Sequence, residues 1–215
     1  MSYSYIPALK YHWLTPIYDW FIGVTMPEIR FKRDLVAQSQ INSGERVLDF
    51  GCGTATLTLM LKEARPQAHI LGIDVDSTIL KKAFQKQKQS SLAIQLDQYE
   101  GGKLPYPDAY FDCVVSSLVF HHLTTAQKIE AFRELYRVLK PAGRFHIADW
   151  GAPQNELMRV AFFVLQIFDN FYTTNDNVQG RLPNLLIEGG FDEVSITKNY
   201  ATIFGTLQLF EVNKS

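Results

Sequence analysis

Short apolar segments alternate with longer amphipathic segments along most of the chain. The short segments are rich in branched and aromatic residues, as expected of strands that are buried in a sheet. Five of them come before residue 150, at 46–50, 69–73, 92–96, 111–116 and 144–148. The longer segments carry apolar residues at helical spacing and predict helices at about 25–41, 57–64, 77–88 and 129–139. This alternation is typical of parallel strands joined by crossover helices.

The C-terminal part of the chain follows a different pattern. The strand-like segments 194–203 and 207–212 are separated by only a short link that contains a glycine, which predicts an antiparallel pair. We therefore predict a single α/β domain over residues 1–215 with a doubly wound, Rossmann-like sheet. The sheet is expected to be mostly parallel and seven-stranded, with an antiparallel edge strand and helices on both faces. Sheets of this kind bind ligands beyond the carboxyl ends of their strands.

The composition is that of an ordinary soluble domain. Hydrophobic residues make up 47% and charged residues 20% of the 215 positions, which excludes wholesale disorder. The 21 Lys and Arg residues nearly balance the 22 Asp and Glu residues, so no overall positive field favours a nucleic-acid partner. The 2 cysteines cannot form a disulfide framework, no signal peptide is visible, and no apolar run approaches the roughly 20 residues that span a bilayer. We expect a soluble cytoplasmic protein without stable membrane insertion.

A glycine-containing loop after the first predicted strand carries the clearest chemical signal. Gly51 and Gly53 lie between that strand and a predicted helix, where glycine lets the backbone approach a ligand closely. Gly-x-Gly alone is weak, and a dinucleotide-binding fingerprint would have glycine or alanine where this chain has Thr56. Asp49, just before the loop, would repel a pyrophosphate but suits a ligand that carries an ammonium group. These residues argue against a nicotinamide-dependent oxidoreductase.

Two further acidic positions follow the next two strands. Asp74 lies at the end of the second strand, 21 residues after Gly53, where a carboxylate can accept hydrogen bonds from both hydroxyls of a ribose. Asp97 and Gln98 follow the third strand and could read the amino group of an adenine. Each position has a simpler explanation when taken alone: a helix cap near Asp74 or Asp76, and a surface turn at Asp97.

Together these residues resemble the class I S-adenosylmethionine-dependent methyltransferases. The first motif of that family, acid-x-Gly-x-Gly-x-Gly, matches Asp49, Gly51 and Gly53, with Ala55 in place of the last glycine. The stretches 111–123 and 132–144 look like later motifs of the family, and the resemblance extends over about 14–212. Within the class, the chain is similar to the ubiquinone/menaquinone-biosynthesis-like (UbiE-like) branch of small-molecule methyltransferases.

The resemblance implies where the methionine end of the cofactor lies. The backbone around Gly51, Gly53 and Thr54 would hold this end, and Asp49 would support its ammonium group. Ser117, at the end of the fourth strand, would lie beside the same moiety. The resemblance implies no metal ion.

The resemblance also implies where the nucleoside part of the cofactor lies. Asp74 would hold the ribose, Val75 would pack on the adenine face, and Asp97 with Gln98 would read the adenine edge. Residues 1–24 would form an N-terminal lid, in which Tyr18 closes over the sulfonium, a cation that aromatic faces attract.

The groups that could act on the methyl acceptor are less clearly marked. His121 and His122 follow the fourth strand, where one of them could serve as a general base or could orient the backbone at the turn. Residues of about 153–180 would form a helical insertion that covers the substrate, as in related methyltransferases. Its apolar stretch Met158–Tyr172 also fits a buried helix or a contact in a homodimer.

The function that the sequence predicts is methyl transfer from S-adenosylmethionine to a small, neutral or lipophilic acceptor, with S-adenosylhomocysteine as the product. The alternative from another class is a catalytically silent protein that binds S-adenosylmethionine as a sensor or as a partner subunit. The sequence leaves open the identity of the acceptor, the methylated atom and the oligomeric state.

Overall fold

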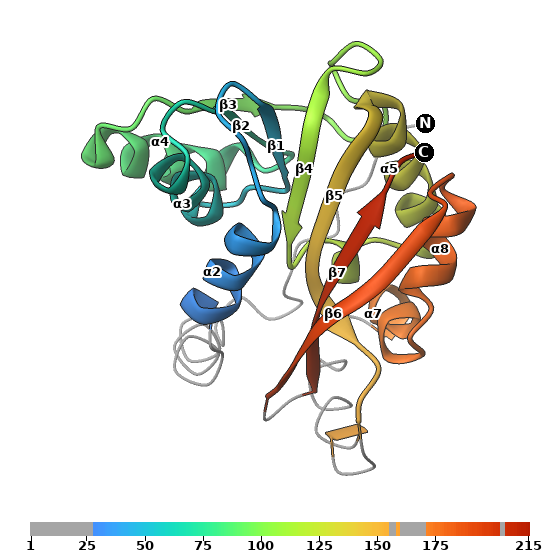
Figure 1. The fold of residues 1–215 in the computed structure, drawn as a ribbon. Coiled ribbons are helices and arrows are strands. Elements are labelled where there is room, and N and C mark those ends of the chain that lie inside the picture. The colour runs from blue at the N-terminus through green and yellow to red at the C-terminus, as the bar shows by residue number, and fades with distance from the viewer. Residues whose placement is uncertain (1–27, 155–157, 160–170, 203–204) are drawn as a thin grey trace.

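The computed structural model of the protein describes residues 28–154, 158–159, 171–202 and 205–215. Its helices are α2 (Glu28–Gln38), α3 (Thr56–Ala64), α4 (Ser77–Ser90), the 3-10 turn η1 (Phe120–His122), α5 (Thr125–Val138), α7 (Phe171–Val178) and α8 (Leu182–Glu188). Its strands are β1 (Arg46–Phe50), β2 (His69–Asp74), β3 (Gln95–Gln98), β4 (Phe111–Ser117), β5 (Leu139–Gly151), β6 (Glu193–Ala201) and β7 (Thr206–Asn213). Figure 1 shows these elements along the chain.

The strands form one 7-stranded sheet in the order β3-β2-β1-β4-β5-β7-β6. Strands β1 to β5 are parallel, and β7 runs antiparallel to both β5 and β6. The predicted doubly wound sheet with an antiparallel edge pair is therefore confirmed. Because β2 and β4 flank β1, the strand order reverses beside β1, and this is the position at which such sheets form ligand sites.

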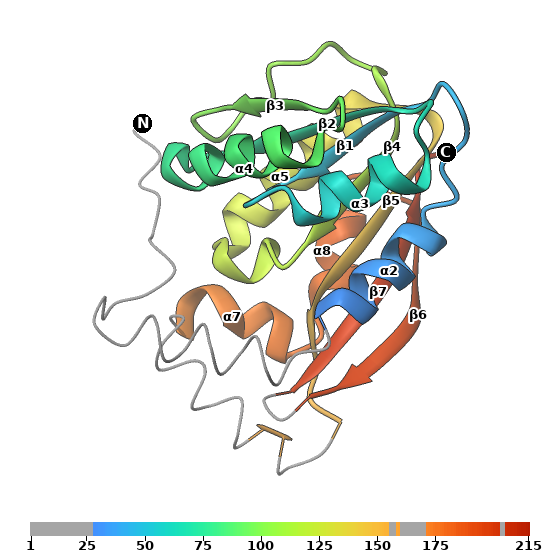
Figure 2. The ribbon, with the colours of Figure 1, turned by 90° about the vertical axis from the view of Figure 1, so that its left-hand side faces the viewer.

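Helices cover both faces of the sheet, as predicted (Figures 1 and 2). One buried cluster packs α2, α3 and α4 against the sheet and includes Phe31, Leu61 and Ala83. The other packs α5 and α8 against the opposite face and includes Phe132 and Leu186. The two clusters hold the strand ends and the loops between them in fixed positions.

Some element boundaries differ from the predicted ones. Strand β3 pairs with β2 only from Gln95 onward, whereas the pattern predicts a strand from Leu92. The reason is local: α4 ends at Ser90 and the next residue, Ser91, has a left-handed conformation, so the chain turns over Leu92 to Ile94 before it pairs with β2. Helix α8 occupies a stretch in which the sequence pattern predicts no element. The expected start of the first predicted helix at Thr25 lies outside the described residues, and α2 is described from Glu28.

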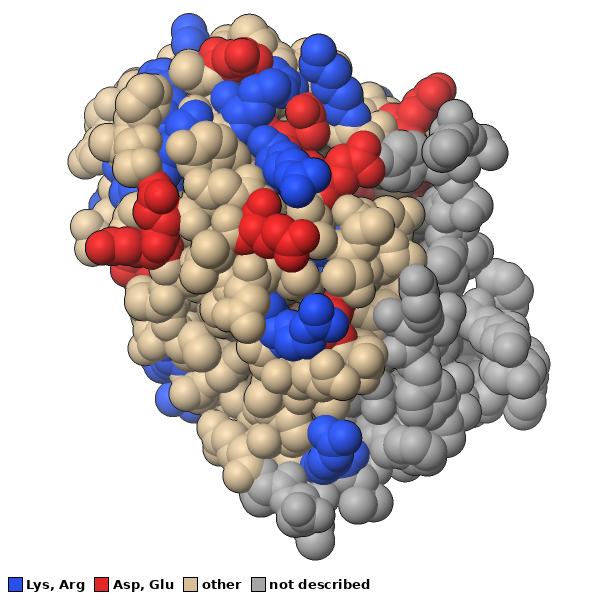
Figure 3. All heavy atoms as spheres, turned by 90° about the vertical axis from the view of Figure 1, so that its right-hand side faces the viewer, with Lys and Arg blue, Asp and Glu red and all other residues tan. Residues whose placement is uncertain are grey.

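The face of the molecule over α8 and β6 carries acidic and basic side chains mixed together (Figure 3). Within the part of the chain that the structure describes, no helix combines the length and the apolar character needed to cross a membrane. The same residues contain no group of three or more His, Cys, Asp or Glu side chains arranged to hold a metal ion.

Candidate active site

A cavity of about 370 Å³ opens at the carboxyl ends of β1, β2 and β4, where the strand order reverses. Its walls come from the loop after β1, from Asp74 at the end of β2 with Val75 after it, from the loop after β3, and from Ser117 at the end of β4 with several residues after it. Lys32 of α2 and one face of α5 complete the lining. This volume suits a ligand the size of a nucleoside derivative.

The loop after β1 is held in a tight conformation. The φ angle is +71° at Gly51, +55° at Gly53 and +61° at Ala55, all in the left-handed region. A Cβ atom on Gly51 would lie 2.3 Å from a methyl group of Val119, so this glycine allows two loops to pack together. A Cβ atom on Gly53 would meet nothing within 4 Å, and Gly53 lines the cavity. Gly53 therefore leaves room beside the backbone that a ligand can use.

Asp74 lies in the cavity wall and also holds the loop. Its Oδ2 accepts a hydrogen bond from the backbone N–H of Gly53 (2.8 Å), and its Oδ1 accepts one from that of Asp76 (3.0 Å). Burial raises the pKa of Asp74, while these backbone donors oppose the shift. Asp76, and not Asp74, caps α4 by accepting from Thr78 and Ile79. The helix-cap explanation thus applies to Asp76, and each Asp74 oxygen keeps a lone pair for a further donor.

Asp49 lies beneath the loop and is not part of the cavity wall. Its side chain is only 1% exposed, and its Oδ2 accepts a hydrogen bond from the Thr58 hydroxyl (2.6 Å). Burial raises the pKa of Asp49 to about 6, and the Thr58 hydroxyl opposes this shift. Any effect of Asp49 on a ligand would therefore act across the loop backbone.

The structure does not bring Asp97 and Gln98 into the cavity wall. Asp97 accepts a hydrogen bond from the Tyr106 hydroxyl (3.0 Å) and others from the Gln95 amide. Gln98 is exposed at the end of β3. The adjacent part of the cavity is lined by Tyr99 and by the two glycines after Glu100 instead.

Three predicted side chains lie at the end of β4 or just after it. Ser117 lines the cavity, and its buried Oγ has no hydrogen-bond partner among the described atoms. His122 also lines the cavity, and burial, with a smaller effect from His121, lowers the pKa of His122 to about 3. His121 is buried behind it, with ring centroids 3.9 Å apart, and its Nδ1 is hydrogen-bonded to Asp149 Oδ1 (2.8 Å). Asp149 also accepts from the backbone N–H of Phe120 (2.7 Å), so it fixes the η1 turn that presents His122.

Sequence reasoning missed the wall that α5 contributes. Gln127, Glu130, Ala131 and Glu134 line the cavity, and their spacing of three and four residues places them on one helix face. The polar stripe in this predicted helix, directly after the segment 117–123, is the signal that could have identified them.

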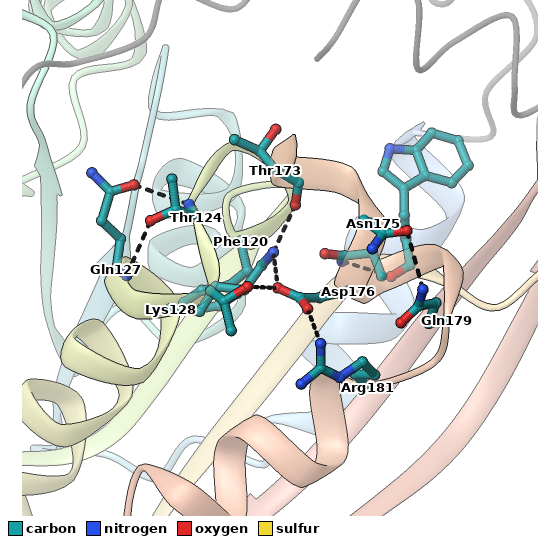
Figure 4. A network of polar contacts seen from close by, with 12 residues as sticks. Phe120, Thr124, Gln127, Lys128, Thr173, Asn175, Asp176, Gln179 and Arg181 are labelled. Atoms are coloured by element: carbon teal, nitrogen blue, oxygen red, sulfur yellow. Dashed lines mark hydrogen bonds and ion pairs between the residues drawn. The ribbon is translucent and has the colours of Figure 1, made fainter. Parts of the chain in front are cut away.

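A buried polar network anchors this wall (Figure 4). Lys128 Nζ donates to the Thr173 carbonyl (2.7 Å) and to Asp176 Oδ2 (3.1 Å), and Arg181 Nη1 donates to Asp176 Oδ1 (3.0 Å). Lys128 and Asp176 are both buried, and they join α5 to α7 and to the start of α8. Removing one partner of such a pair leaves an uncompensated charge, so the network holds the α5 wall firmly in place.

Two of the predicted regions lie wholly or mostly outside the described residues. The expected lid over 1–24, including Tyr18, lies wholly outside them. Most of the apolar stretch Met158–Tyr172 lies outside them as well. Within the expected insertion of about 153–180, the structure describes α7 and a few residues before it.

Comparison with known proteins decides the family. Residues 47–143 match the methyltransferase domain family. The ubiquinone/menaquinone biosynthesis C-methyltransferase UbiE of Pseudomonas putida (strain GB-1) is 31% identical over 186 residues, which cover 77% of this chain and 72% of that protein. The chain belongs to the UbiE-like class I S-adenosylmethionine-dependent methyltransferases. The UbiE of Pseudomonas aeruginosa (strain LESB58) matches with the same identity and coverage.

Solved methyltransferase structures share the fold of this UbiE-like enzyme. A methyltransferase from Aquifex aeolicus that depends on S-adenosylmethionine superposes with a TM-score of 0.62 at 19% identity, over 85% of this chain and 87% of that one. The methyltransferase SibL superposes with a TM-score of 0.71 at 20% identity, over 85% of this chain and 54% of SibL. The family match and the UbiE relatives show that the protein is a methyltransferase with S-adenosylmethionine as its cofactor, as predicted.

Three residues of the cavity show that this UbiE-like methyltransferase can hold S-adenosylmethionine. The buried Ser117 Oγ needs a partner that the described protein atoms do not supply. The space beside Gly53 is open, and Asp74 faces the same cavity with acceptor capacity to spare. Together they offer room for the amino-acid end and an acceptor for ribose hydroxyls.

Substituting alanine for each of the two loop glycines in turn separates an effect on protein stability from an effect on ligand binding. We expect Gly53→Ala to destabilise the protein by only about 1 kcal/mol, the usual order for alanine in a left-handed conformation. The same change is expected to weaken S-adenosylhomocysteine binding by about tenfold or more, because the methyl group fills cavity space. Gly51→Ala should instead destabilise the ligand-free protein, because its Cβ would collide with Val119. Urea unfolding and calorimetry measure both effects, and unchanged binding in Gly53→Ala would contradict the assignment.

Proposed function

We propose that this enzyme methylates a ring carbon of a small, neutral, lipophilic aromatic acceptor of the quinol type. The observation that carries the proposal is the name of the relatives at about 30% identity, which are ubiquinone/menaquinone biosynthesis C-methyltransferases. The apolar run 160–168 in the sequence supports it, since such a segment suits contact with a lipophilic molecule. A charged acceptor would lose its solvation in contact with so apolar a segment.

The proposed cofactor site consists mainly of groups that hold and orient. We assign the ribose hydroxyls to Asp74, the adenine face to Val75, and the methionine end to the backbone of Gly51, Gly53 and Thr54. When bound, S-adenosylmethionine supplies an activated methyl group on a sulfonium. The protein would then accelerate methyl transfer mainly by placing the acceptor within ~3–3.5 Å of that carbon and by excluding water.

Other predicted cofactor residues keep more indirect roles in this proposal. We assign Asp49 to the ammonium group, on which its buried charge would act across the loop. Ser117 would give its hydroxyl to the methionine end, and Tyr18 would cover the sulfonium. Asp97 and Gln98 would support the adenine end through the strand end and the following loop, since neither lines the cavity.

We assign the contact with the acceptor hydroxyl to His122 and a positioning role to His121. His122 lines the cavity, and His121 packs against it while bound to Asp149. With its pKa at about 3, the His122 imidazole is neutral near neutral pH and can accept a hydrogen bond there. Such an acceptor would hold a phenolic hydroxyl by a hydrogen bond and so orient the ring whose carbon is methylated.

The pH dependence of the rate tests this assignment. A histidine with its ordinary pKa of 6.5 would lose its neutral form as the pH falls through that value, whereas His122 keeps it down to about pH 3. We expect kcat to show no histidine limb between about pH 5.5 and about pH 8. We also expect His122→Gln to lower kcat by about tenfold or more while leaving S-adenosylhomocysteine affinity nearly unchanged. A limb near pH 6.5 that disappears in His122→Gln would contradict a neutral His122.

The acceptor class is tested with methyl-labelled S-adenosylmethionine and a panel of acceptors. The panel contains quinols with short and long isoprenoid tails, a catechol, an amine and a nucleotide, and NMR of each product locates the methyl group. We expect methylation at a ring carbon of a quinol and little reaction with the nucleotide. Exclusive methylation of oxygen or nitrogen would reject the C-methyl assignment. Tight cofactor binding without any product would instead favour the silent binding protein.

A further inference from the structure

The buried side chain of Asn177, in the last turn of α7, contacts the end of β5. Its Nδ2 donates to the carbonyl of Trp150 (2.8 Å) and to Asp149 Oδ1 (3.3 Å), so both hydrogens of the amide are used. Its Oδ1 has no hydrogen-bond partner among the described residues, although the side chain is fully buried. An unpaired buried amide oxygen costs stability, so the fold as such gains little from an asparagine here. What distinguishes Asn177 from an apolar residue of the same size is its donor side, which bonds to Asp149.

Asp149 joins Asn177 to the η1 turn. It is fully buried, and its oxygens also accept from the backbone N–H of Phe120 (2.7 Å) and from His121 Nδ1 (2.8 Å). Burial by itself would raise the pKa of Asp149, but His121 and the backbone donors lower this pKa below its ordinary value. The carboxylate is therefore ionised and can only accept, which places a proton on His121 Nδ1. Asn177 adds a further donor to this buried charge from the side of α7.

This series of contacts meets the cavity at His122. Of the four side chains in the series, His122 lines the cavity, whereas Asn177, Asp149 and His121 do not. The rings of His121 and His122 pack with their centroids 3.9 Å apart and their planes at 44°. Since η1 is a single turn and Asp149 holds its first two residues, the direction of the His122 ring depends on where Asp149 lies.

We infer that Asn177 is a positioning residue for methyl transfer, which fixes the His122 ring in the cavity wall through Asp149 and His121. The inference rests on the proposed contact between His122 and the acceptor hydroxyl. Asn177 would affect the rate from α7 without touching substrate or cofactor, because it does not line the cavity.

Steady-state kinetics of the full chain, with S-adenosylmethionine and a quinol that has a short isoprenoid tail, test the inference. Asn177→Leu replaces the amide by an apolar group of similar size. We expect kcat to fall about tenfold, because a small displacement of an orienting group costs that order, while the S-adenosylhomocysteine affinity stays within about twofold.

Thr125→Val is the matched control. The Thr125 hydroxyl also joins α5 to α7, by donating to Asp176 Oδ2 (2.7 Å), and Thr125 does not line the cavity. The variant therefore loses one hydrogen bond that anchors α7 but leaves the contacts of Asp149 in place. We expect its kcat to stay within about twofold of the unaltered value.

A double-mutant cycle shows whether Asn177 acts through His122. Once His122→Gln has removed the imidazole, adding Asn177→Leu should change kcat by no more than about twofold, since no ring remains to be positioned. The ring ¹H and ¹⁵N NMR signals of His121 and His122 give a second readout that needs no acceptor. We expect these signals to shift in Asn177→Leu and to stay in place in Thr125→Val.

The other outcomes overturn the inference. Unchanged kcat in folded Asn177→Leu, unchanged ring signals, or losses that simply multiply in the cycle would show that Asn177 does not act through His122. If neither Asn177→Leu nor the smaller Asn177→Ala gives folded protein by circular dichroism, Asn177 serves the fold and the inference is wrong. A failure of the proposed function looks different: the unaltered chain would leave the quinol unmethylated, or His122→Gln would keep its full kcat, and the inference would fail with it.

Discussion

Asp74→Ala is expected to weaken the binding of S-adenosylhomocysteine by about 10²–10⁴-fold. Two hydrogen bonds from the ribose hydroxyls to a carboxylate would be lost, each worth about 1.5–3 kcal/mol. The backbone N–H of Gly53 would lose its acceptor at the same time, so the loop that surrounds the methionine end would loosen. Isothermal titration calorimetry on the folded variant measures the effect.

A neighbouring acid provides the control for this experiment. Asp76 caps α4 through Thr78 and Ile79 and does not line the cavity. We expect Asp76→Ala to cost about 1 kcal/mol of stability, as for a lost helix cap, with little change in affinity. If Asp74→Ala behaves like Asp76→Ala, the ribose contact is absent and Asp74 has only a structural role.

Asp49→Asn is expected to raise the free energy of unfolding by about 3 kcal/mol at about pH 8. Burial raises the pKa of Asp49 from 3.8 to about 6, so the folded chain bears the cost of a buried charge at high pH. Below pH 3.8 the carboxyl is protonated in both the folded and the unfolded chain, and the cost vanishes. The stability of the unaltered protein should therefore fall as the pH rises between these two values. Asparagine keeps an oxygen that can accept the Thr58 hydrogen bond without the charge.

The same substitution should harm function. Without the negative charge beneath the loop, the ammonium group of the cofactor loses an attractive field, and affinity is expected to fall by about tenfold. Urea unfolding at about pH 8 and about pH 4, combined with calorimetry, separates the two effects. A variant that is less stable than the unaltered protein at both pH values would show that Asp49 is not strained by burial. Thr58→Val, which removes the hydroxyl donor, should shift stability in the opposite direction at high pH.

The positions of the strands and of the main loop could be predicted because they depend on local patterns. The runs that became β1, β2 and β4 are apolar and short, and the residues at or just after their ends, including Gly51 and Asp74, must emerge at one edge of a parallel sheet. Ser117 ends β4 and lines the cavity by the same rule. Strand β3 could not be located as well, because Leu92 and its neighbours have the composition of a strand but lie in a turn.

Which acids face the cavity could not be predicted. Four of the five β1 residues are buried, so the strand shows no alternation that tells on which side Asp49 lies. The fold places Asp49 on the same face of the sheet as Val47, which packs in the cluster that α3 covers, and there the Thr58 hydroxyl donates to Asp49. Asp97 likewise turns to Tyr106, whose approach depends on how the loop after β3 folds back.

The fold class and the strand ends where the cofactor site would form could be predicted from the sequence alone, because strand length, helical spacing and a glycine loop are properties of neighbouring residues. The methyltransferase family came from the resemblance of the motifs around Asp49 and Gly51. Which side chains share the cavity is a property of the tertiary structure. The lysines of α4 are equivalent as a pattern, and Lys86 differs from Lys81 only because α3 brings Thr56 to it. The α5 wall likewise exists because a helix far along the chain packs beside the end of β4. Contacts between elements depend on packing angles and buried partners, which no local pattern contains.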